Sequence, residues 1–163
     1  MTTSKAVVTK ENKTIEDVYL AAGALEKLFL DKVPVDLFRY VEADAPPNRM
    51  VLYPVVEPGL LDNGQTRSSD LDRRKIEGIW YVFPARRTGL STFAGPAKFR
   101  RAGRFFVIPK GTTIPQGLAI GEDNLHAVFK YIHYSIMHRF VMTEMHYLFL
   151  LRRLASFAVP YTP

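Results

Sequence analysis

The chain has 163 residues, a length that fits one domain, and its 47% hydrophobic and 23% charged residues are typical of a folded protein. The absence of cysteine excludes disulfides, thiolate metal sites and a cysteine nucleophile, and it fits a protein that works in a reducing cytosol. The 22 basic residues outnumber the 16 acidic ones, and the net charge of +6 fits either an anionic partner or a basic surface kept only for solubility.

The sequence also gives no sign of a membrane segment. Its start lacks the apolar run of a secretory signal peptide, and no apolar run approaches the ~18 residues that span a bilayer. We therefore expect no membrane contact, and we expect any export to use a route that does not require a secretory signal peptide. Because the sequence contains no internal repeat, residues 1–163 are expected to form one domain, with 1–13 flexible.

The first third of the chain predicts one helix followed by strands. Apolar residues at helical spacing run from Thr14, a predicted N-cap, to Phe29, and Pro34 ends the segment. The alternation in Val35–Val41 predicts a strand, and Met50–Val56 predicts a second one. The following residues, 57–69, are rich in Gly, Pro, Asn and Ser and predict a loop.

The middle of the chain is basic. Asp70–Glu77 is charged and predicts a short helix, and Gly78–Phe83 predicts a strand that contains the single tryptophan. Arg86 and Arg87 then form a basic turn that leads into Gly89–Phe93, a segment with two adjacent hydroxyls and an aromatic ring.

The segment from Phe105 to Met137 has the densest turn signals of the chain. Two Pro-x-Gly units, Pro109–Gly111 and Pro115–Gly117, predict paired turns, because proline fixes φ and glycine permits positive φ two residues later. Strands are predicted before the turns at 105–108 and after them at 118–120 and 131–137. Phe140–Phe157 then predicts a core helix, so the whole pattern indicates an α+β fold.

Three sets of polar residues are candidates for a site. Arg39 lies within a predicted strand, where its guanidinium would suit a diphosphate or would simply face solvent. Ser91 and Thr92 would hold ribose hydroxyls, with Phe93 stacking on a planar ring, or would form a capped turn. His133 lies in an apolar strand and would line a cleft or be a satisfied core histidine.

Several other functions lack their motifs. The sequence has neither a phosphate-binding loop nor a dinucleotide-binding glycine fingerprint, and its four histidines lack the spacing of a helical zinc site, so no metal is expected. It has no zinc-finger spacing and no single basic helix, so nucleic-acid binding is supported by charge alone.

The order of the motifs resembles one known family. These motifs are Leu37-Phe38-Arg39, Gly89-Leu90-Ser91-Thr92-Phe93, Arg100-Arg101-Ala102, the run from Phe106 to Pro115 (FVIPKGTTIP), and His133-Tyr134-Ser135-Ile136-Met137. Together they resemble the ADP-ribosyltransferase-like toxins of the type VI secretion effectors, which have relatives in fungi. The resemblance implies a single-domain α+β fold with a split mixed β core, an N-terminal helix and a C-terminal helix.

The resemblance also implies an activity. A protein of this family would be a mono-ADP-ribosyltransferase-like toxin that uses NAD to modify an unknown macromolecular target, and an immunity protein would be a possible partner. Hydrolysis of NAD without an acceptor remains an alternative within the same chemistry. An inactive basic module that binds RNA or a protein partner is an alternative from a different class.

The same resemblance assigns roles to individual residues. Arg39 would be the strand arginine that grips the NAD phosphate and ribose region, with Arg86 and Arg87 near the diphosphate. Ser91 would scaffold the nicotinamide ribose pocket, with Thr92 beside it and Phe93 facing the ring.

The family's third position, a glutamate in the wider fold, falls on His133. The nearest acids, Glu122 and Asp123, are expected in a turn, far along the chain from that strand. We therefore expect a neutral His133 to position the ribose, and the usual carboxylate mechanism to be altered or supplied from elsewhere.

Overall fold

The structure is a computed structural model of the chain. It describes residues 13–45, 50–55, 59–60, 66–67, 69–85, 88–97, 103–127 and 129–163. Arg86, Arg87 and the Arg100-Arg101-Ala102 motif lie outside the described residues, as do 1–12 of the segment that was expected to be flexible.

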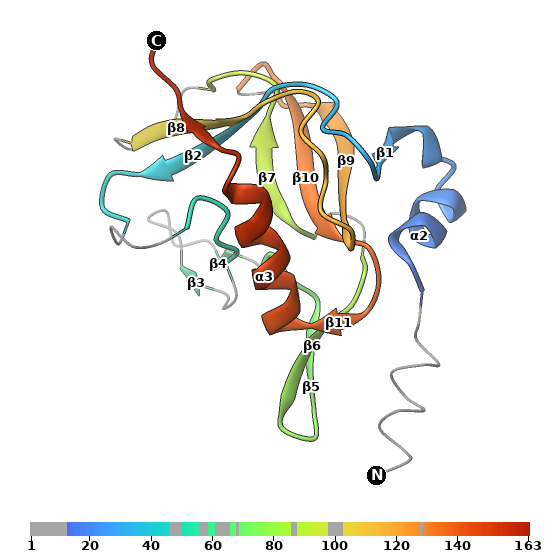
Figure 1. Cartoon of the computed structure of the whole chain (residues 1–163). Coiled ribbons are helices and arrows are strands. Elements are labelled where there is room, and N and C mark those ends of the chain that lie inside the picture. The colour runs from blue at the N-terminus through green and yellow to red at the C-terminus, as the bar shows by residue number, and fades with distance from the viewer. Residues whose placement is uncertain are drawn as a thin grey trace.

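A seven-stranded sheet is the largest element of the fold (Figure 1). Its strands are, in spatial order, β1 (Leu28–Phe29), β9 (Leu118–Leu125), β10 (Ile132–His138), β7 (Leu90–Phe93), β2 (Leu37–Glu42), β8 (Gly103–Ile108) and β12 (Val159–Pro160). Every one of these neighbours pairs antiparallel. The described sheet is therefore antiparallel and not the mixed sheet that the resemblance implied.

Two smaller sheets and the helices complete the described part. The smaller sheets are β11 (Met142–Thr143), β6 (Ile79–Val82) and β5 (Arg73–Ile76), in that order, and the pair β3 (Gly59–Leu60) and β4 (Thr66–Arg67). The helices are α2 (Ile15–Ala21), the short 3-10 helix η1 (Leu25–Lys27) and α3 (Glu144–Ala155). The predicted α+β class is thus confirmed, and none of the described helices is long and apolar enough to cross a bilayer.

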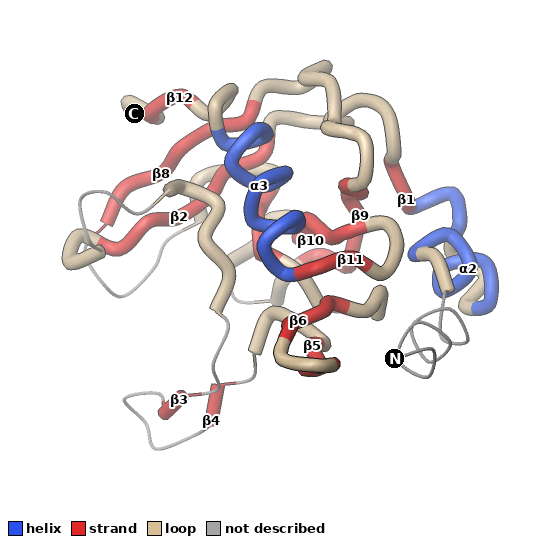
Figure 2. The backbone as a smooth tube through the Cα atoms, turned by 60° about the horizontal axis from the view of Figure 1, so that its bottom comes forward, coloured by secondary structure: helices blue, strands red, loops and turns tan. Residues whose placement is uncertain are grey.

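Helix α3 covers one face of the large sheet, as the two views in Figures 1 and 2 show. It begins at its N-cap Thr143, whose hydroxyl accepts a hydrogen bond from the His146 amide at 3.2 Å. Tyr147, on the inner face of the helix, is fully buried, and its hydroxyl donates to the Ile136 carbonyl of β10 at 3.0 Å. Ile136 and Tyr134, two residues apart on β10, therefore face α3 within the same apolar core.

A second, smaller core lies under α2, beside β9 and β10. Its buried residues are Ile15, Tyr19, Ala24, Ala119 and Met137. Because Met137 neighbours Ile136 in the strand, it points to the opposite face of the sheet, away from α3. The part of that face toward the start of β10 is left to polar side chains.

Both predicted Pro-x-Gly turns are confirmed. The Thr112 amide donates to the Pro109 carbonyl, and the Leu118 amide donates to the Pro115 carbonyl, which closes the two turns. The third residue of each unit, Gly111 or Gly117, has a positive φ, of 85° and 104° respectively. These turns deliver the chain from β8 into β9, so they set the position of the strand that carries the site.

Three predicted elements were wrong in detail, and the loop predicted at 57–69 contains the short strands β3 and β4. The helix expected to reach Phe29 ends at Ala21, because Gly23 adopts a φ of +68° and the chain then enters η1 and β1. The segment 70–77 contains strand β5, not a helix, because its charged side chains lie on a hairpin with β6. Residues 50–55 of the second predicted strand are irregular.

Candidate functional site

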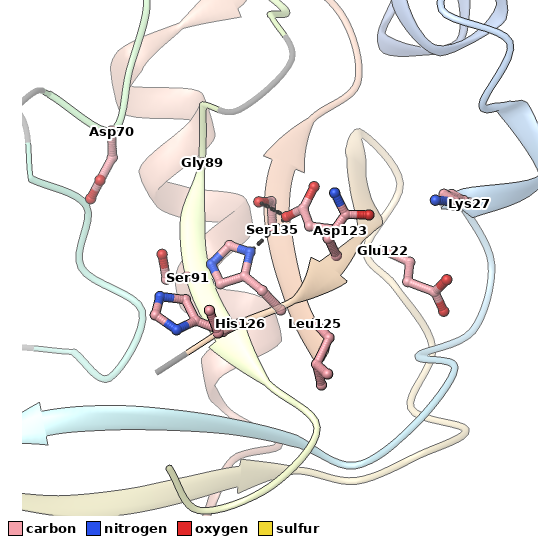
Figure 3. A pocket seen from close by; sticks show the side chains of 12 residues that line it. Lys27, Asp70, Gly89, Ser91, Glu122, Asp123, Leu125, His126 and Ser135 are labelled. Atoms are coloured by element: carbon pink, nitrogen blue, oxygen red, sulfur yellow. Dashed lines mark hydrogen bonds and ion pairs between the residues drawn. The ribbon is translucent and has the colours of Figure 1, made fainter. Parts of the chain in front are cut away.

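A pocket of about 500 Å³ lies on the face of the large sheet that α3 does not cover (Figure 3). Its lining comes from η1, from Asp70 ahead of β5, from β7 and the glycine before it, from β9 and the turn after it, and from β10. The lining residues are Lys27, Asp70, Gly89, Ser91, Glu122, Asp123, Asn124, Leu125, His126, Ala127, His133 and Ser135. The volume falls within the range of small-molecule sites in proteins.

Strand register brings two of the predicted site residues together. Ser91 of β7 is directly opposite Ser135 of β10, and Phe93 is opposite His133. Because side chains alternate along a strand, these four residues share one face of the sheet. Ser91 and His133, which are 42 residues apart in sequence, therefore line the same pocket.

A β-bulge in β9 adds a carboxylate to this pair. Ile132 is opposite Leu125, whereas Tyr134 is opposite Glu122, so β9 carries one extra residue between these two positions. Asp123 lies within the bulge. Its Oδ2 is 2.6 Å from His133 Nδ1 and accepts a hydrogen bond from Ser135 Oγ at 2.8 Å (Figure 3).

These contacts indicate the hydrogen-bond roles within the cluster formed by Asp123, His133 and Ser135. An ionised carboxylate only accepts hydrogen bonds, so in this pair Nδ1 of His133 carries the proton. With that proton on Nδ1, Nε2 of His133 is left for a contact with a ligand. Within the described residues, Oδ1 of Asp123 and the hydroxyl of Ser91 make no hydrogen bond, so both can contact a ligand.

The other acid of this strand has a different environment. Glu122 accepts a hydrogen bond from the Tyr134 hydroxyl at 3.1 Å, on the opposite face of the sheet. Burial, reinforced by this hydrogen bond and by the charge of Glu122, raises the pKa of Tyr134 to about 12. Adjacent acids on one strand thus have separate roles, and Asp123 alone joins the cluster.

Glu122 and Asp123 were expected in a turn, and that prediction was wrong. Strand β9 extends to Leu125, so both acids lie in the strand that pairs with His133. The reason is the hairpin between β9 and β10. Its antiparallel register brings residues that are ten apart in sequence to within 2.6 Å.

Arg39 supports the pocket from outside its lining. Its guanidinium donates to three backbone carbonyls, those of Ser91 at 2.8 Å, Tyr53 at 3.2 Å and Val51 at 3.4 Å. These bonds tie the segment 51–53 to β7 at the residue whose hydroxyl faces the pocket. Arg39 is therefore a positioning residue for Ser91 in this structure.

Thr92 and Phe93 are both buried. Thr92 points to the opposite face from Ser91, and its hydroxyl donates to the Tyr134 carbonyl at 3.0 Å. Phe93 is 5% exposed, and its ring meets those of His126, Phe129 and His133 edge-on. Neither is among the lining residues, so they act as the floor and support of the site.

The lining also contains residues that sequence analysis did not single out. Asp70 is held at the edge of the pocket because its Oδ2 accepts from the Val55 amide at 2.6 Å and its carbonyl accepts from the Gly89 amide at 2.7 Å. Among the described lining residues Lys27 of η1 is the one cation, whereas Asp70 and Asp123 bring carboxylates to the pocket, so the described lining has an acidic excess although the chain is basic. Among the described residues, no group of three or more His, Asp or Glu could hold a metal ion.

Comparison with known proteins gives no further guide to the site. No model of a known protein family matches the sequence, and no curated protein matches it significantly.

Proposed function

We propose that the chain is an NAD-consuming enzyme of the ADP-ribosyltransferase-like type, and that it transfers ADP-ribose from NAD to a macromolecular acceptor. One observation carries the proposal: a carboxylate, Asp123, is fixed in a pocket beside Ser91 and His133, the residues to which the family resemblance assigns the nicotinamide ribose. It supplies the charge that His133 by itself lacks.

The reaction requires a site that stabilises positive charge. In NAD the nicotinamide ring nitrogen is cationic. When its bond to ribose C1′ breaks, the electron pair goes to the ring nitrogen, neutral nicotinamide leaves, and the ribose acquires oxocarbenium character. A nucleophile of the acceptor then attacks C1′ and loses its proton to solvent. By analogy with other single electrostatic groups in active sites, a carboxylate placed at such a centre raises the reaction rate about 10²- to 10³-fold.

The cluster fits these requirements. Oδ1 of Asp123 is available to face the developing cation, because Oδ2 already accepts from His133 and Ser135. Asp123 holds His133 through Nδ1, and Nε2 of the neutral imidazole would accept a hydrogen bond from a ribose hydroxyl. Ser91, held through its carbonyl by Arg39, presents its hydroxyl from the neighbouring strand.

The charges of the pocket favour the nicotinamide riboside half of NAD. The carboxylates of Asp70 and Asp123 would attract a cationic ring, and the diphosphate would lie toward Lys27 at the η1 end. Arg39 is committed to backbone carbonyls, so it would contribute to binding through Ser91.

The decisive experiment is to incubate the purified chain with adenine-labelled NAD and a cell lysate, and to measure both nicotinamide release and label in macromolecules. Nicotinamide release with macromolecular label supports transfer. Nicotinamide release with only free ADP-ribose would make the enzyme an NAD glycohydrolase, with water as the nucleophile. If the chain releases no nicotinamide above a heat-denatured control, the proposal is rejected.

A further inference from the structure

The outward face of α3 carries large apolar side chains that no described residue covers. Met145 and Phe149 lie one helical turn apart and are 82% and 55% exposed. The imidazole of His146 stacks on the Phe149 ring, with centroids 6.2 Å apart. Phe157, just beyond the helix, is 52% exposed. Scattered exposed apolar residues are common on protein surfaces, but a row along one helix is typical of an interaction surface.

Two arginines continue this face toward the end of the helix. Arg152 and Arg153 are both exposed, and within the described residues neither side chain forms an ion pair. The one acid of the helix, Glu144, is in its first turn and pairs with Arg73 at 3.4 Å. The face is therefore apolar at its start and positively charged at its end.

The helix is a rigid platform for such a contact. Its inner face is anchored by four buried residues, Tyr147, Leu150, Leu151 and Leu154. The pocket lies on the other side of the sheet, as Figure 3 shows with α3 behind β7 and β10. A partner on α3 would therefore leave the pocket open.

We infer that the outward face of α3 binds an amphipathic helix of a partner protein, with apolar residues against Met145 and Phe149 and acidic residues against Arg152 and Arg153. Charge complementarity selects an acidic partner, because no carboxylate of the described residues pairs with Arg152 or Arg153. A protein is favoured over nucleic acid, since two cations beside an apolar row offer few phosphate contacts. This inference does not rest on the proposed enzymatic function.

The test uses two labelled peptides of roughly four helical turns, with leucines at three- and four-residue spacing. One has glutamates beside the leucines, and its twin has lysine at each of those positions. Fluorescence anisotropy with the full chain is expected to show the acidic peptide binding at least about tenfold more tightly than its twin. The double variant Arg152→Glu/Arg153→Glu should reverse that preference, and Phe149→Asp should abolish binding of both.

Three results would overturn the inference. The first is no preference between the peptides in the parent chain. The second concerns the control variant Lys75→Glu/Lys110→Glu, which has the same change in net charge at exposed sites outside α3. If it loses as much affinity for the acidic peptide as Arg152→Glu/Arg153→Glu does, the binding depends on overall charge. The third is a short single-stranded RNA that binds more tightly than the acidic peptide and loses affinity in Arg152→Glu/Arg153→Glu. Circular dichroism of each variant excludes unfolding as the cause.

Discussion

Replacing Asp123 with asparagine is the sharpest perturbation of the site. Asparagine has nearly the same shape, so the pocket should persist, but the negative charge that faces the developing cation is lost. The hydrogen bonds that Oδ2 accepts at 2.6 and 2.8 Å also lose their charge assistance, which loosens His133 and Ser135. We expect the rate of nicotinamide release to fall about 10²- to 10³-fold, or about 2.7–4 kcal/mol in activation free energy.

The measurement is the initial rate of nicotinamide release from NAD at saturating substrate. Asp44→Asn is the matched control, because Asp44 is exposed and lies outside the pocket lining, and its rate should equal that of the parent chain. Urea unfolding of both variants checks that they are folded. If Asp123→Asn is folded and keeps most of the parent rate, Asp123 does not stabilise the transition state and the reasoning fails.

The remaining predictions concern the support of the site and the core. Arg39→Ala should slow nicotinamide release and lower the free energy of unfolding in urea by about 1–2 kcal/mol, because three backbone carbonyls, including that of Ser91, lose a charged donor. An unchanged rate of nicotinamide release would contradict the positioning role. Gly121→Ala should cost about 1–3 kcal/mol, because its Cβ would meet the buried Tyr19 hydroxyl, and a variant as stable as the parent chain would refute that packing. Burial lowers the pKa of His138 to about 4, below the 6.5 of the unfolded chain, so the free energy of unfolding should fall by about 3 kcal/mol as the pH drops from above 6.5 toward 4. Urea titrations at both pH values should show that His138→Gln lacks this part of the fall. An identical fall in the variant would contradict the prediction.

Local sequence signals were sufficient for the scaffold. The two Pro-x-Gly units encode their turns directly, since proline and glycine each restrict or permit particular φ values. The strand predicted at 131–137 and the helix predicted at 140–157 also follow from local patterns, and the structure has them at 132–138 and 144–155. The failures occurred where tertiary context decides. The charged segment 73–76 has no apolar periodicity, and only its pairing with β6 makes it a strand.

The candidate site shows the same division. Ser91 and His133 were assigned to the site through the family resemblance of their local motifs, and the structure places both in one pocket. Asp123 was missed because its role depends on the register of the β9–β10 hairpin and on a one-residue bulge, which no local pattern encodes. The sequence did contain one indication of this role, because two neighbouring strands joined by a short connection are expected to pair antiparallel. Extending the predicted strand 118–120 by a few residues would have placed Asp123 opposite His133.

The central claim is that NAD occupies the pocket around Asp123, and histidine side-chain NMR signals test it most directly. The chain has four histidines, of which His133 and His126 line the pocket, whereas His146 lies on the outward face of α3. During titration with NAD, the signals of His133 and His126 should shift saturably while that of His146 stays fixed. Shifts at His146 alone, or no saturable shift at His133, would contradict the claim.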